Sequence, residues 1–415
     1  MITSYKQLRQ VVDTTVANTK ITDVHTHLYS PCFKDMLLWG IDELLNYHYL
    51  VAETFRWLNI PYEDFWSMDK KAQANLIWKT LFEDNSPYSE ACRGVLTTLK
   101  KLGLDVGSRD IDSYRSFFAG FSVEDYVDRV FEVSGVEKVI MTNNPFDQEE
   151  RDIWLNSYVP DSRFKAALRI DPLLIDTCNA LNKLKDWGYN IGDELNDNTY
   201  KEVIRFLSEW IERMDALYVA ASLPYDFCFP DDSVSTKIIE NCILPVCREY
   251  NIPFALMIGV KRLINPDLKL AGDGVGKGSI ESVEYLCAKY PHNKFMVTML
   301  SRENQHELAV SARKFRNLLV FGCWWFLNNP SLIDEITRMR FELLGVSVIP
   351  QHSDARVLDQ LIYKWEHSKN IIADVLYDKY KDLMDTGWRI SEDEIERDVQ
   401  KLFGGNFWTF LSAKF

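Results

Sequence analysis

Short runs of apolar and β-branched residues alternate along this chain with longer stretches in which apolar residues recur at helical spacing. The runs that we expect to form strands are residues 21–25, 138–142, 166–170, 218–223, 254–258, 295–299, 318–322 and 347–351. Stretches with helical spacing lie between most of them, including residues 200–214, 279–290 and 306–315. Eight buried strands that alternate with helices are typical of a parallel sheet with helices packed outside it. The pattern therefore predicts an α/β fold, specifically a (β/α)8 TIM barrel.

Two regions depart from this alternation. Residues 31–131 are rich in Trp, Leu, Tyr and Glu, show helical periodicity and contain no convincing strand. We expect a helical insertion here, placed after the first strand as a lid over the barrel mouth. Residues 359–410 also follow a helical pattern, and Ser391 with Glu394 has the spacing of a capping box. Since no repeat, low-complexity tract or Pro- or Ser-rich linker divides the chain, we expect residues 1–415 to form a single domain with a helical C-terminal tail.

Composition and charge narrow the possible partners. The chain has 415 residues, of which 47% are hydrophobic, and a formal net charge of −14. Because no basic run offsets that charge, we expect no nucleic-acid partner, and an anionic substrate must be captured by local cations. We see no signal-peptide pattern and no apolar run long enough to span a membrane. Eight scattered cysteines without a CxxC pair indicate reduced thiols in a cytoplasmic protein. A homo-oligomer is compatible with these properties.

Candidate metal ligands lie at the two ends of the barrel sequence. His25 and His27 are two residues apart on the first expected strand, so their side chains point to the same side. Asp354 follows the last expected strand, which pairs with the first strand in a closed barrel. Two imidazoles and one carboxylate with open positions are typical of a catalytic metal site. The alternative is an acid that caps a loop beside two core histidines.

Several arginines also follow strands. Arg169 ends the third strand, Arg302 follows the sixth, and Arg356 lies two residues after Asp354. Guanidinium groups bind carboxylates through two parallel hydrogen bonds, so these side chains are candidates for an anionic substrate. Salt bridges at the barrel rim are the alternative, above all for Arg302, which has acidic neighbours.

Aromatic residues near the same end of the barrel add further candidates. His48 and Tyr49 lie in the helical insertion, where they either pack a helix or contribute a hydroxyl that exchanges protons when a neighbouring cation lowers its pKa. Trp324 and Trp325 follow the seventh strand and provide flat apolar walls suited to a sugar, or simply fill space. We expect the remaining histidines to lie on the surface or in loops: His292, His306, His352 and His367.

Taken together, six segments in this order resemble the uronate isomerase family of the amidohydrolase superfamily. They are Asp-Val-His-Thr-His-Leu (23–28), Asn-Tyr-His-Tyr-Leu (46–50), Ala-Leu-Arg-Ile-Asp-Pro (167–172), Thr-Met-Leu-Ser-Arg-Glu-Asn-Gln-His-Glu-Leu (298–308), Phe-Gly-Cys-Trp-Trp-Phe (321–326) and Gln-His-Ser-Asp-Ala-Arg (351–356). The likeness runs from about residue 20 to residue 410 and is greatest to the shorter bacterial branch. It implies a barrel of the amidohydrolase type that interconverts D-glucuronate with D-fructuronate and D-galacturonate with D-tagaturonate.

The resemblance also implies roles for individual residues. His25, His27 and Asp354 would hold one divalent metal ion, usually zinc, and Asp354 would help to open the sugar ring. Tyr49 with Arg169 would transfer a proton between C2 and C1 through an enediol. The other implied substrate contacts are His48, Arg302, Arg356, Trp324 and Trp325.

One position departs from the pattern of the larger family branch. That branch carries a histidine on the fifth strand, whereas Met257 stands at this position here and Arg262 is retained. A further nitrogen ligand from this strand is therefore in doubt.

Two other functions remain open. The first is a mononuclear metal-dependent hydrolase or decarboxylase of the same superfamily. The absence of histidines from the fourth to sixth strands counts against a dinuclear hydrolase. The second is a barrel that binds sugar acids without turnover.

Overall fold

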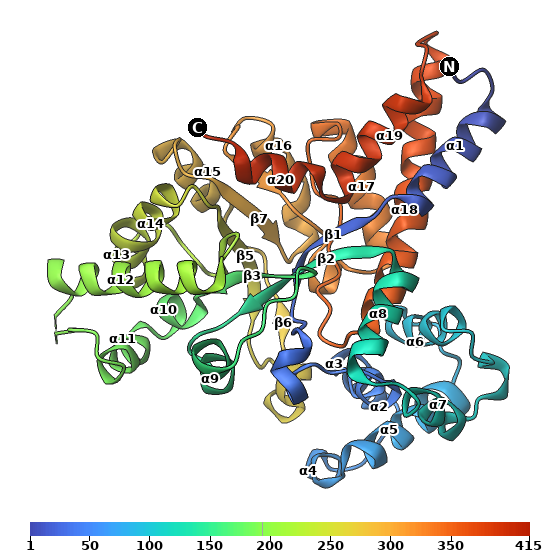
Figure 1. The fold of residues 1–415 in the computed structure, drawn as a ribbon, viewed down its shortest axis with the longest axis horizontal. Helices are drawn as coiled ribbons and strands as arrows, with labels where there is room; N and C mark the ends of the chain where they lie inside the picture. The colour runs from blue at the N-terminus through green and yellow to red at the C-terminus, as the bar shows by residue number, and fades with distance from the viewer. Residues whose placement is uncertain (193) are drawn as a thin grey trace.

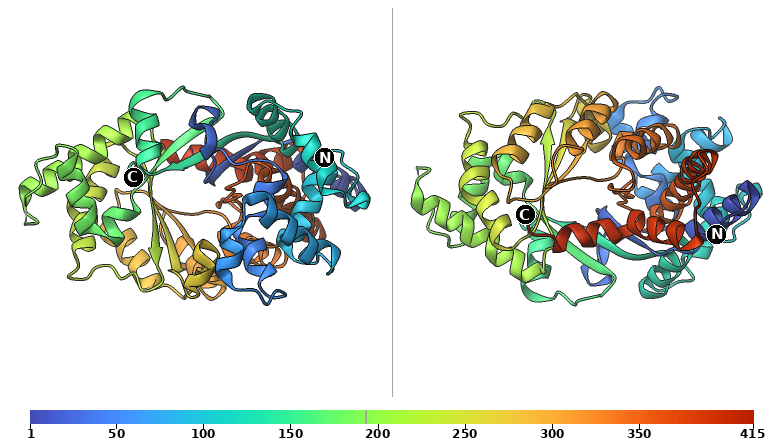
Figure 2. Two further views of the ribbon diagram at one scale, coloured as in Figure 1. Left: turned by 90° about the horizontal axis from the view of Figure 1, so that it is seen from below. Right: turned by 90° about the horizontal axis from the view of Figure 1, so that it is seen from above.

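A curled parallel sheet forms the centre of the computed structural model, which describes residues 1–192 and 194–415 (Figure 1). Its parallel strands pair in chain order and are β1 (Ile21–Thr26), β2 (Val136–Asn143), β3 (Phe164–Arg169), β4 (Val219–Pro224), β5 (Phe254–Lys261), β7 (Phe295–Met299) and β8 (Leu318–Val320). The short strand β6 (Gly274–Val275), which the sequence pattern did not indicate, pairs antiparallel with β5. Helices surround the strands in the two views of Figure 2. The structure therefore confirms an α/β fold of the TIM-barrel type.

The eighth expected strand is much less regular than its apolar sequence predicts. Residues 347–351 pair with β8 through one bridge, at which the Ile349 N–H donates to Val320 O (3.0 Å) and the Gly322 N–H donates to Ile349 O (2.8 Å). The chain then meets β1, where the His27 N–H donates to Ala355 O at 2.7 Å. An irregular segment, rather than a full strand, therefore connects the last strand to the first and brings residues 352–356 beside β1.

Helices follow most of the strands, as the periodicity predicts. The three helices expected from spacing are α12 (Asp197–Met214), α15 (Ile280–Lys289) and α16 (Gln305–Ala312). In α12 the buried side chains recur every three or four residues, from Val203 to Met214, which forms the apolar face that packs on the sheet. The other elements between strands are α9 (Gln148–Asn156), α10 (Asp171–Ile175), α11 (Thr177–Asp186), α13 (Val234–Ile238), η4 (Ile239–Ile243), α14 (Leu244–Glu249), η5 (Pro266–Gly272), η6 (Arg302–Asn304), η7 (Trp325–Leu327) and α17 (Pro330–Leu344).

Helices make up most of the segment between β1 and β2, all of which the structure describes, and no strand lies in it. It contains η1 (Pro31–Met36), α2 (Ile41–Leu45), α3 (His48–Thr54), α4 (Tyr62–Ser67), α5 (Lys70–Trp78), η2 (Lys79–Glu83), α6 (Glu90–Lys101), η3 (Val106–Ser108), α7 (Ile111–Phe118) and α8 (Val123–Ser134). In Figure 1 the helices α2 to α7 gather at the lower right, to one side of the sheet.

The C-terminal part of the chain forms a group of helices, and the N-terminal helix packs against this group. The N-terminal α1 (Tyr5–Asn18), which we did not expect, packs against α18 (Gln360–Asp385). The remaining elements are α19 (Glu392–Gln400), η8 (Lys401–Gly405) and α20 (Asn406–Ser412). The capping box predicted at Ser391 and Glu394 is present at the start of α19. No helix among residues 1–192 and 194–415 combines the length and the apolarity needed to cross a membrane.

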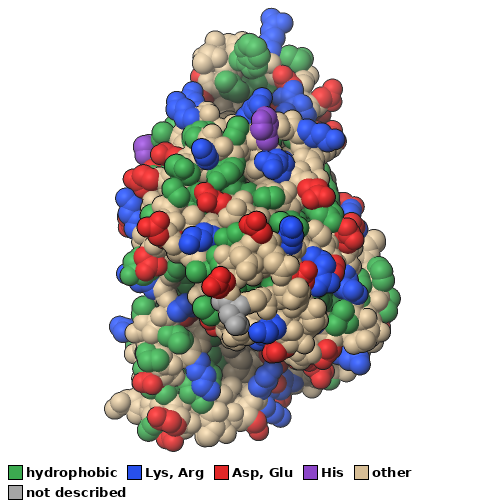
Figure 3. Space-filling model, turned by 90° about the vertical axis from the view of Figure 1, so that its left-hand side faces the viewer, with side chains coloured by type: hydrophobic (Ala, Val, Ile, Leu, Met, Phe, Trp, Pro, Cys, Tyr) green, Lys and Arg blue, Asp and Glu red, His purple; other side chains and the backbone are tan. Residues whose placement is uncertain are grey.

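Side chains fill the inside of the sheet. Small and branched residues from successive strands, such as Val24, Ile140 and Ala220, form one buried cluster with Tyr218 and Phe407. Phe407 comes from α20, and its ring centre lies 6.2 Å from that of Tyr218. The barrel is therefore a packed core rather than a pore. On the face shown in Figure 3, acidic and basic side chains are interspersed rather than separated by sign.

Candidate metal centre and active site

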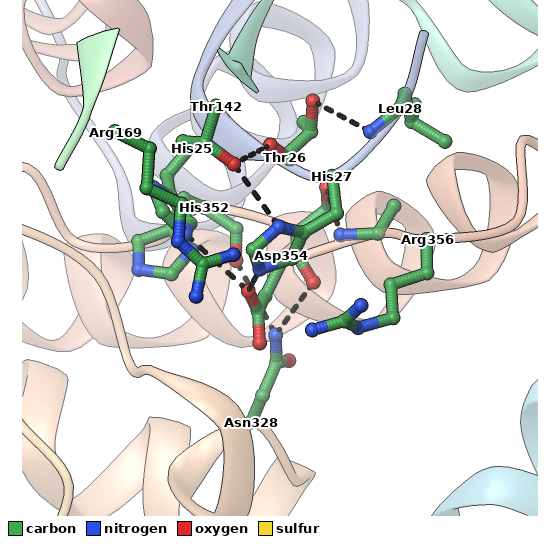
Figure 4. A network of polar contacts seen from close by, with 12 residues as sticks. His25, Thr26, His27, Leu28, Thr142, Arg169, Asn328, His352, Asp354 and Arg356 are labelled. Atoms are coloured by element: carbon green, nitrogen blue, oxygen red, sulfur yellow. Dashed lines mark hydrogen bonds and ion pairs between the residues drawn. The ribbon is translucent and has the colours of Figure 1, made fainter. Parts of the chain in front are cut away.

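The two ends of the barrel sequence bring three metal-binding side chains together. The potential donor atoms of His25, His27 and Asp354 all lie within 4.8 Å of one another (Figure 4). Asp354 Oδ1 lies 3.5 Å from His25 Nε2 and 3.3 Å from His27 Nε2. The geometry thus agrees with the expectation that barrel closure brings Asp354 to the histidines of β1.

Hydrogen bonds orient both imidazoles toward that point. His27 Nδ1 lies 3.0 Å from Thr142 Oγ1, and the Thr142 hydroxyl donates to Thr26 O at 2.8 Å. Since the threonine proton is used in that bond, its oxygen accepts from the Nδ1–H of His27, and Nε2 keeps its lone pair. Tyr218 acts in the same way on His25, because its hydroxyl donates to Val24 O (2.8 Å) and lies 3.4 Å from His25 Nδ1.

The charges of this group fit a divalent cation. Burial lowers the pKa of His27 well below its ordinary value, so this imidazole is neutral. Burial favours protonation of Asp354, but the two adjacent imidazoles of His25 and His27 outweigh it and hold the Asp354 pKa well below its usual range. His25 Nε2 and Asp354 Oδ1 are buried without a hydrogen-bond partner. One carboxylate oxygen and two imidazole nitrogens that face it form a candidate metal site.

The backbone of Asp354 adopts a rare conformation that several contacts maintain. Its φ angle is 54°, in the left-handed region, and its N–H donates to His25 O at 3.2 Å. Just before it, the Ser353 N–H donates to the carboxylate of Asp23 at 3.0 Å, and this carboxylate also accepts from Trp365 Nε1 (2.8 Å). A strained residue held from several sides is common at functional sites.

A cavity of about 530 Å³ adjoins the three ligands. His27, Thr142, Arg169 and Arg356 line it, and Figure 4 shows the two arginines reaching toward Asp354 from opposite sides. The other lining residues are Tyr29, Met36, Leu38, Glu43, Asn46, Tyr47, Val51, Trp66, Asn144, Asp147, Glu150, Lys269, Leu270, Ala271 and Val357. These side chains come from loops and insertion helices whose contacts no local sequence pattern specifies.

The two cavity arginines differ in their partners. Arg169 Nε and Nη2 donate to Asp171 Oδ2 at 2.9 and 2.5 Å. Burial opposes the charge of Arg169, but the Asp171 carboxylate outweighs it and raises the Arg169 pKa. Within residues 1–192 and 194–415, the guanidinium of Arg356 has no acidic partner, and only its backbone N–H is bonded, to Gln360 Oε1 at 2.8 Å.

His48 and Tyr49 differ in which cavities they line. His48 lines the main cavity, and burial lowers its pKa to about 3. Tyr49 lines a neighbouring cavity of about 300 Å³, and His48 lines both cavities. It is Tyr47, whose ring centre lies 4.8 Å from that of Tyr49, that lines the main cavity. Burial raises the pKa of Tyr49 well above its ordinary value, contrary to our expectation that a neighbouring cation lowers it.

Three further expected contacts lie outside the main cavity. Trp325 lines the neighbouring cavity with Tyr49, whereas Trp324 is buried in the core inside the barrel. Arg302 is 57% exposed and forms an ion pair with Glu335 on α17 at 2.9 Å. In this structure the rim salt bridge is thus the better description of Arg302.

One histidine that we placed on the surface or in a loop is fully buried. The ring centre of His352 lies 5.1 Å from that of His25, and neither of its nitrogens has a hydrogen-bond partner. Gly322 makes room for it, since a Cβ there would lie 1.9 Å from His352 Cδ2. The only sequence signal was its position two residues before Asp354. His292 and His306 are exposed, as expected, and His367 is half-buried. Met257, which stands where the larger family branch has a histidine, is buried inside the barrel.

Comparisons with known proteins agree with this site. No family model matches the chain, and neither does any curated protein. A uronate isomerase from Bacillus halodurans C-125 is 57% identical, with a TM-score of 0.98 over 100% of this chain and 98% of that one. Two more distant structures share the fold. The uronate isomerase from Thermotoga maritima is 14% identical (TM-score 0.79, covering 99% of this chain and 100% of that one). The glucuronate isomerase from Caulobacter crescentus is 12% identical (TM-score 0.71, covering 98% and 94%).

The likeness to the Bacillus structure extends over the whole chain and so covers the barrel, the insertion and the C-terminal helices. With 57% identity over that length, this chain belongs to the uronate isomerase family.

Proposed function

We propose that this enzyme interconverts D-glucuronate with D-fructuronate and D-galacturonate with D-tagaturonate. The observation that carries the proposal is the meeting of His25, His27 and Asp354 beside a cavity with two arginines. A metal ion suits a sugar hydroxyl or carbonyl, and guanidinium groups suit the negative charge of a uronate.

His25, His27 and Asp354 would hold the metal, which we take to be zinc because two imidazoles and one carboxylate with open positions suit that ion. When bound, the ion would polarise a substrate oxygen as a Lewis acid. Thr142 and Tyr218 keep the Nε2 lone pairs of the two imidazoles directed at it.

The first step opens the sugar ring. Asp354 accepts the proton of the anomeric hydroxyl while the bond between C1 and the ring oxygen breaks, and this proton then passes to the ring oxygen. This leaves a free aldehyde at C1, next to the hydrogen on C2.

The second step moves a proton from C2 to C1. Tyr49 removes the C2 proton, the electrons of that bond form the double bond of an enediol, and the aldehyde oxygen gains negative charge. Arg169 stabilises this charge, a contribution of about 3 kcal/mol for one well-placed donor. Return of the proton to C1, with transfer of the C2 hydroxyl proton to the C1 oxygen, completes the ketose.

The raised pKa of Tyr49 keeps its hydroxyl protonated in the free protein. Burial is the main cause, and the negative charge of Asp354 adds to it. A divalent cation on Asp354 would offset that charge and lower the Tyr49 pKa.

The insertion between β1 and β2 would serve as the lid of this site. It contributes Tyr47, His48 and Trp66 to the cavity wall, and Trp66 Nε1 donates to Asp267 O on η5 at 2.8 Å. We place the reaction in the cytoplasm, which agrees with eight cysteines that remain free thiols.

The test is to follow ketose formation by the zinc-loaded protein with each hexuronate in deuterium oxide. Formation of the ketose would support the proposal, and solvent deuterium at C1 would identify an exchangeable base. No ketose from either hexuronate, with zinc bound, would refute the isomerase and favour the metal-dependent hydrolase. Tyr49→Phe should reduce kcat severely with little change in binding, whereas a larger loss in Tyr47→Phe would transfer the proton-transfer role to Tyr47.

A further inference from the structure

Asp171 holds one side of Arg169 in place. Arg169 is the last residue of β3 and Asp171 the first of α10, and both Arg169 Nε and Nη2 donate to Asp171 Oδ2. The other oxygen, Asp171 Oδ1, accepts the Ser222 N–H of β4 at 2.9 Å. Both side chains are largely buried, with exposed fractions of 22% and 11%. The guanidinium is thus fixed to two neighbouring strands.

This arrangement leaves one part of Arg169 for the cavity. Its Nη1 has no hydrogen-bond partner among residues 1–192 and 194–415, and the side chain lines the cavity wall. A donor held in advance by the protein requires no reorganisation when charge develops on a substrate oxygen. The orientation set by Asp171 therefore suits an oxygen whose charge appears only during the reaction.

The same contact neutralises the charge of Arg169. The Asp171 carboxylate is adjacent, so the pair has little net charge to attract a free anion. Arg356, on the opposite side of the cavity, has no acidic partner among the described residues. Arg356 lines the same cavity as His27 and His48. A partly buried cation without an acidic partner is stabilised when an anion binds beside it.

We propose that Asp171 is a positioning residue, which makes Arg169 a donor to the enediolate oxygen and leaves capture of the substrate carboxylate to Arg356. This assignment rests on the proposed isomerase activity. The sequence made both arginines candidates for binding the anionic substrate, whereas here Arg169 acts on the reacting oxygen and Arg356 binds the substrate carboxylate.

The experiment compares D-glucuronate with D-glucuronamide, in which a neutral amide replaces the carboxylate. Asp171→Asn keeps the shape of the side chain but removes its charge. It should reduce kcat roughly tenfold or more for both substrates, because Arg169 loses its fixed orientation. KM for glucuronate should stay the same or fall, since the charge of Arg169 is no longer compensated. Arg356→Met should raise KM for glucuronate about tenfold or more and leave KM for glucuronamide nearly unchanged.

A matched control lies at the other end of the same strand. Asp161 and Arg163 form a pair with the same spacing just before β3, with Arg163 Nη2 2.8 Å from Asp161 Oδ2. Asp161→Asn should leave both kinetic constants unchanged, which separates positioning from a general loss of stability. Zinc content and thermal unfolding of each variant complete the comparison.

Arg169→Lys provides a second route if Asp171→Asn does not fold. Lysine keeps the charge but cannot make the two-nitrogen contact, so kcat should fall while the preference for glucuronate over glucuronamide remains. If Asp171→Asn retains full kcat, or if either variant raises KM for glucuronate alone, the assignment is wrong. Absence of turnover in the unmodified enzyme would instead refute the isomerase activity itself.

Discussion

Thr142 and Tyr218 determine which nitrogen of each histidine faces the candidate metal site. Each hydroxyl donates its own proton to a backbone carbonyl of β1 and so can only accept from the imidazole beside it. Neither residue is a ligand, yet each fixes a tautomer. Partners of this kind usually influence metal affinity strongly, because an imidazole in the wrong tautomer presents a proton instead of a lone pair.

We therefore predict that Thr142→Val weakens zinc binding about 10- to 100-fold while the fold is retained. Valine has nearly the same shape but cannot accept the His27 Nδ1–H. Zinc affinity is measured by competition with a chromophoric chelator. Thr97→Val is the matched control, because Thr97 Oγ1 contacts His367 Nε2 at 3.0 Å, a histidine not among the metal ligands. Equal zinc affinity in the Thr142 variant and the unmodified protein would show that Thr142 does not orient His27.

At this scale the sequence predicted the cluster of candidate metal ligands but not the residues around it. His25, His27 and Asp354 could be placed together because barrel topology alone makes the last strand a neighbour of the first. The sequence could not show that Tyr47 rather than Tyr49 lines the main cavity, because this depends on how α3 is rotated. It could not pair Arg302 with Glu335 either, since that partner lies 33 residues away on another helix.

At the scale of elements, a buried ion pair joins the insertion to the C-terminal tail. Lys364 of α18 donates to Glu90 of α6 at 2.6 Å, with exposed fractions of 4% and 14%. The Lys364 ammonium also lies 5.8 Å from the ring centre of Tyr49. The same two helices are joined at their surface by Lys101 and Glu366, which are 39% and 34% exposed. The two pairs thus differ mainly in burial.

We predict that Lys364→Met lowers the free energy of unfolding by about 3–5 kcal/mol, because Glu90 keeps a largely buried charge without its partner. Adding Glu90→Gln should recover much of this loss. The surface pair is the control, and Lys101→Met should cost about 0–1 kcal/mol. Urea unfolding measures all four proteins. Equal effects of Lys364→Met and Lys101→Met would mean that burial of the first pair has no energetic consequence.

The sequence predicts the order of the strands and helices more reliably than it predicts how regular each one is. Seven expected strands and three expected helices form because each carries a buried apolar face at the right period. Residues 347–351 are equally apolar, but the chain leaves β8 after a single bridge so that Asp354 can turn back toward β1. The helix α1 was missed because its few buried residues, Leu8, Val12 and Val16, are separated by many polar ones.

At the scale of the whole molecule, the C-terminal helix is connected to the metal site through the inside of the barrel. Phe407 of α20 is fully buried against Tyr218, and the Tyr218 hydroxyl lies beside His25 Nδ1. Packing at the bottom of the barrel therefore supports the residue that orients a metal ligand. A substitution that disturbs the packing of α20 should therefore change metal binding at the other end of the barrel.

We predict that Phe407→Ala lowers both stability and zinc affinity. The cavity left by the ring should cost about 3–5 kcal/mol of unfolding free energy, and Tyr218 can relax into it, away from His25. Phe131→Ala is the matched control, because Phe131 is a buried ring of α8 whose centre lies 5.4 Å from that of Phe164, and neither is a metal ligand. It should lose similar stability but keep its zinc affinity. If both variants bind zinc as tightly as the unmodified protein, the metal ligands are held independently of the tail, because loss of the Phe407 ring then leaves the orientation of His25 unchanged.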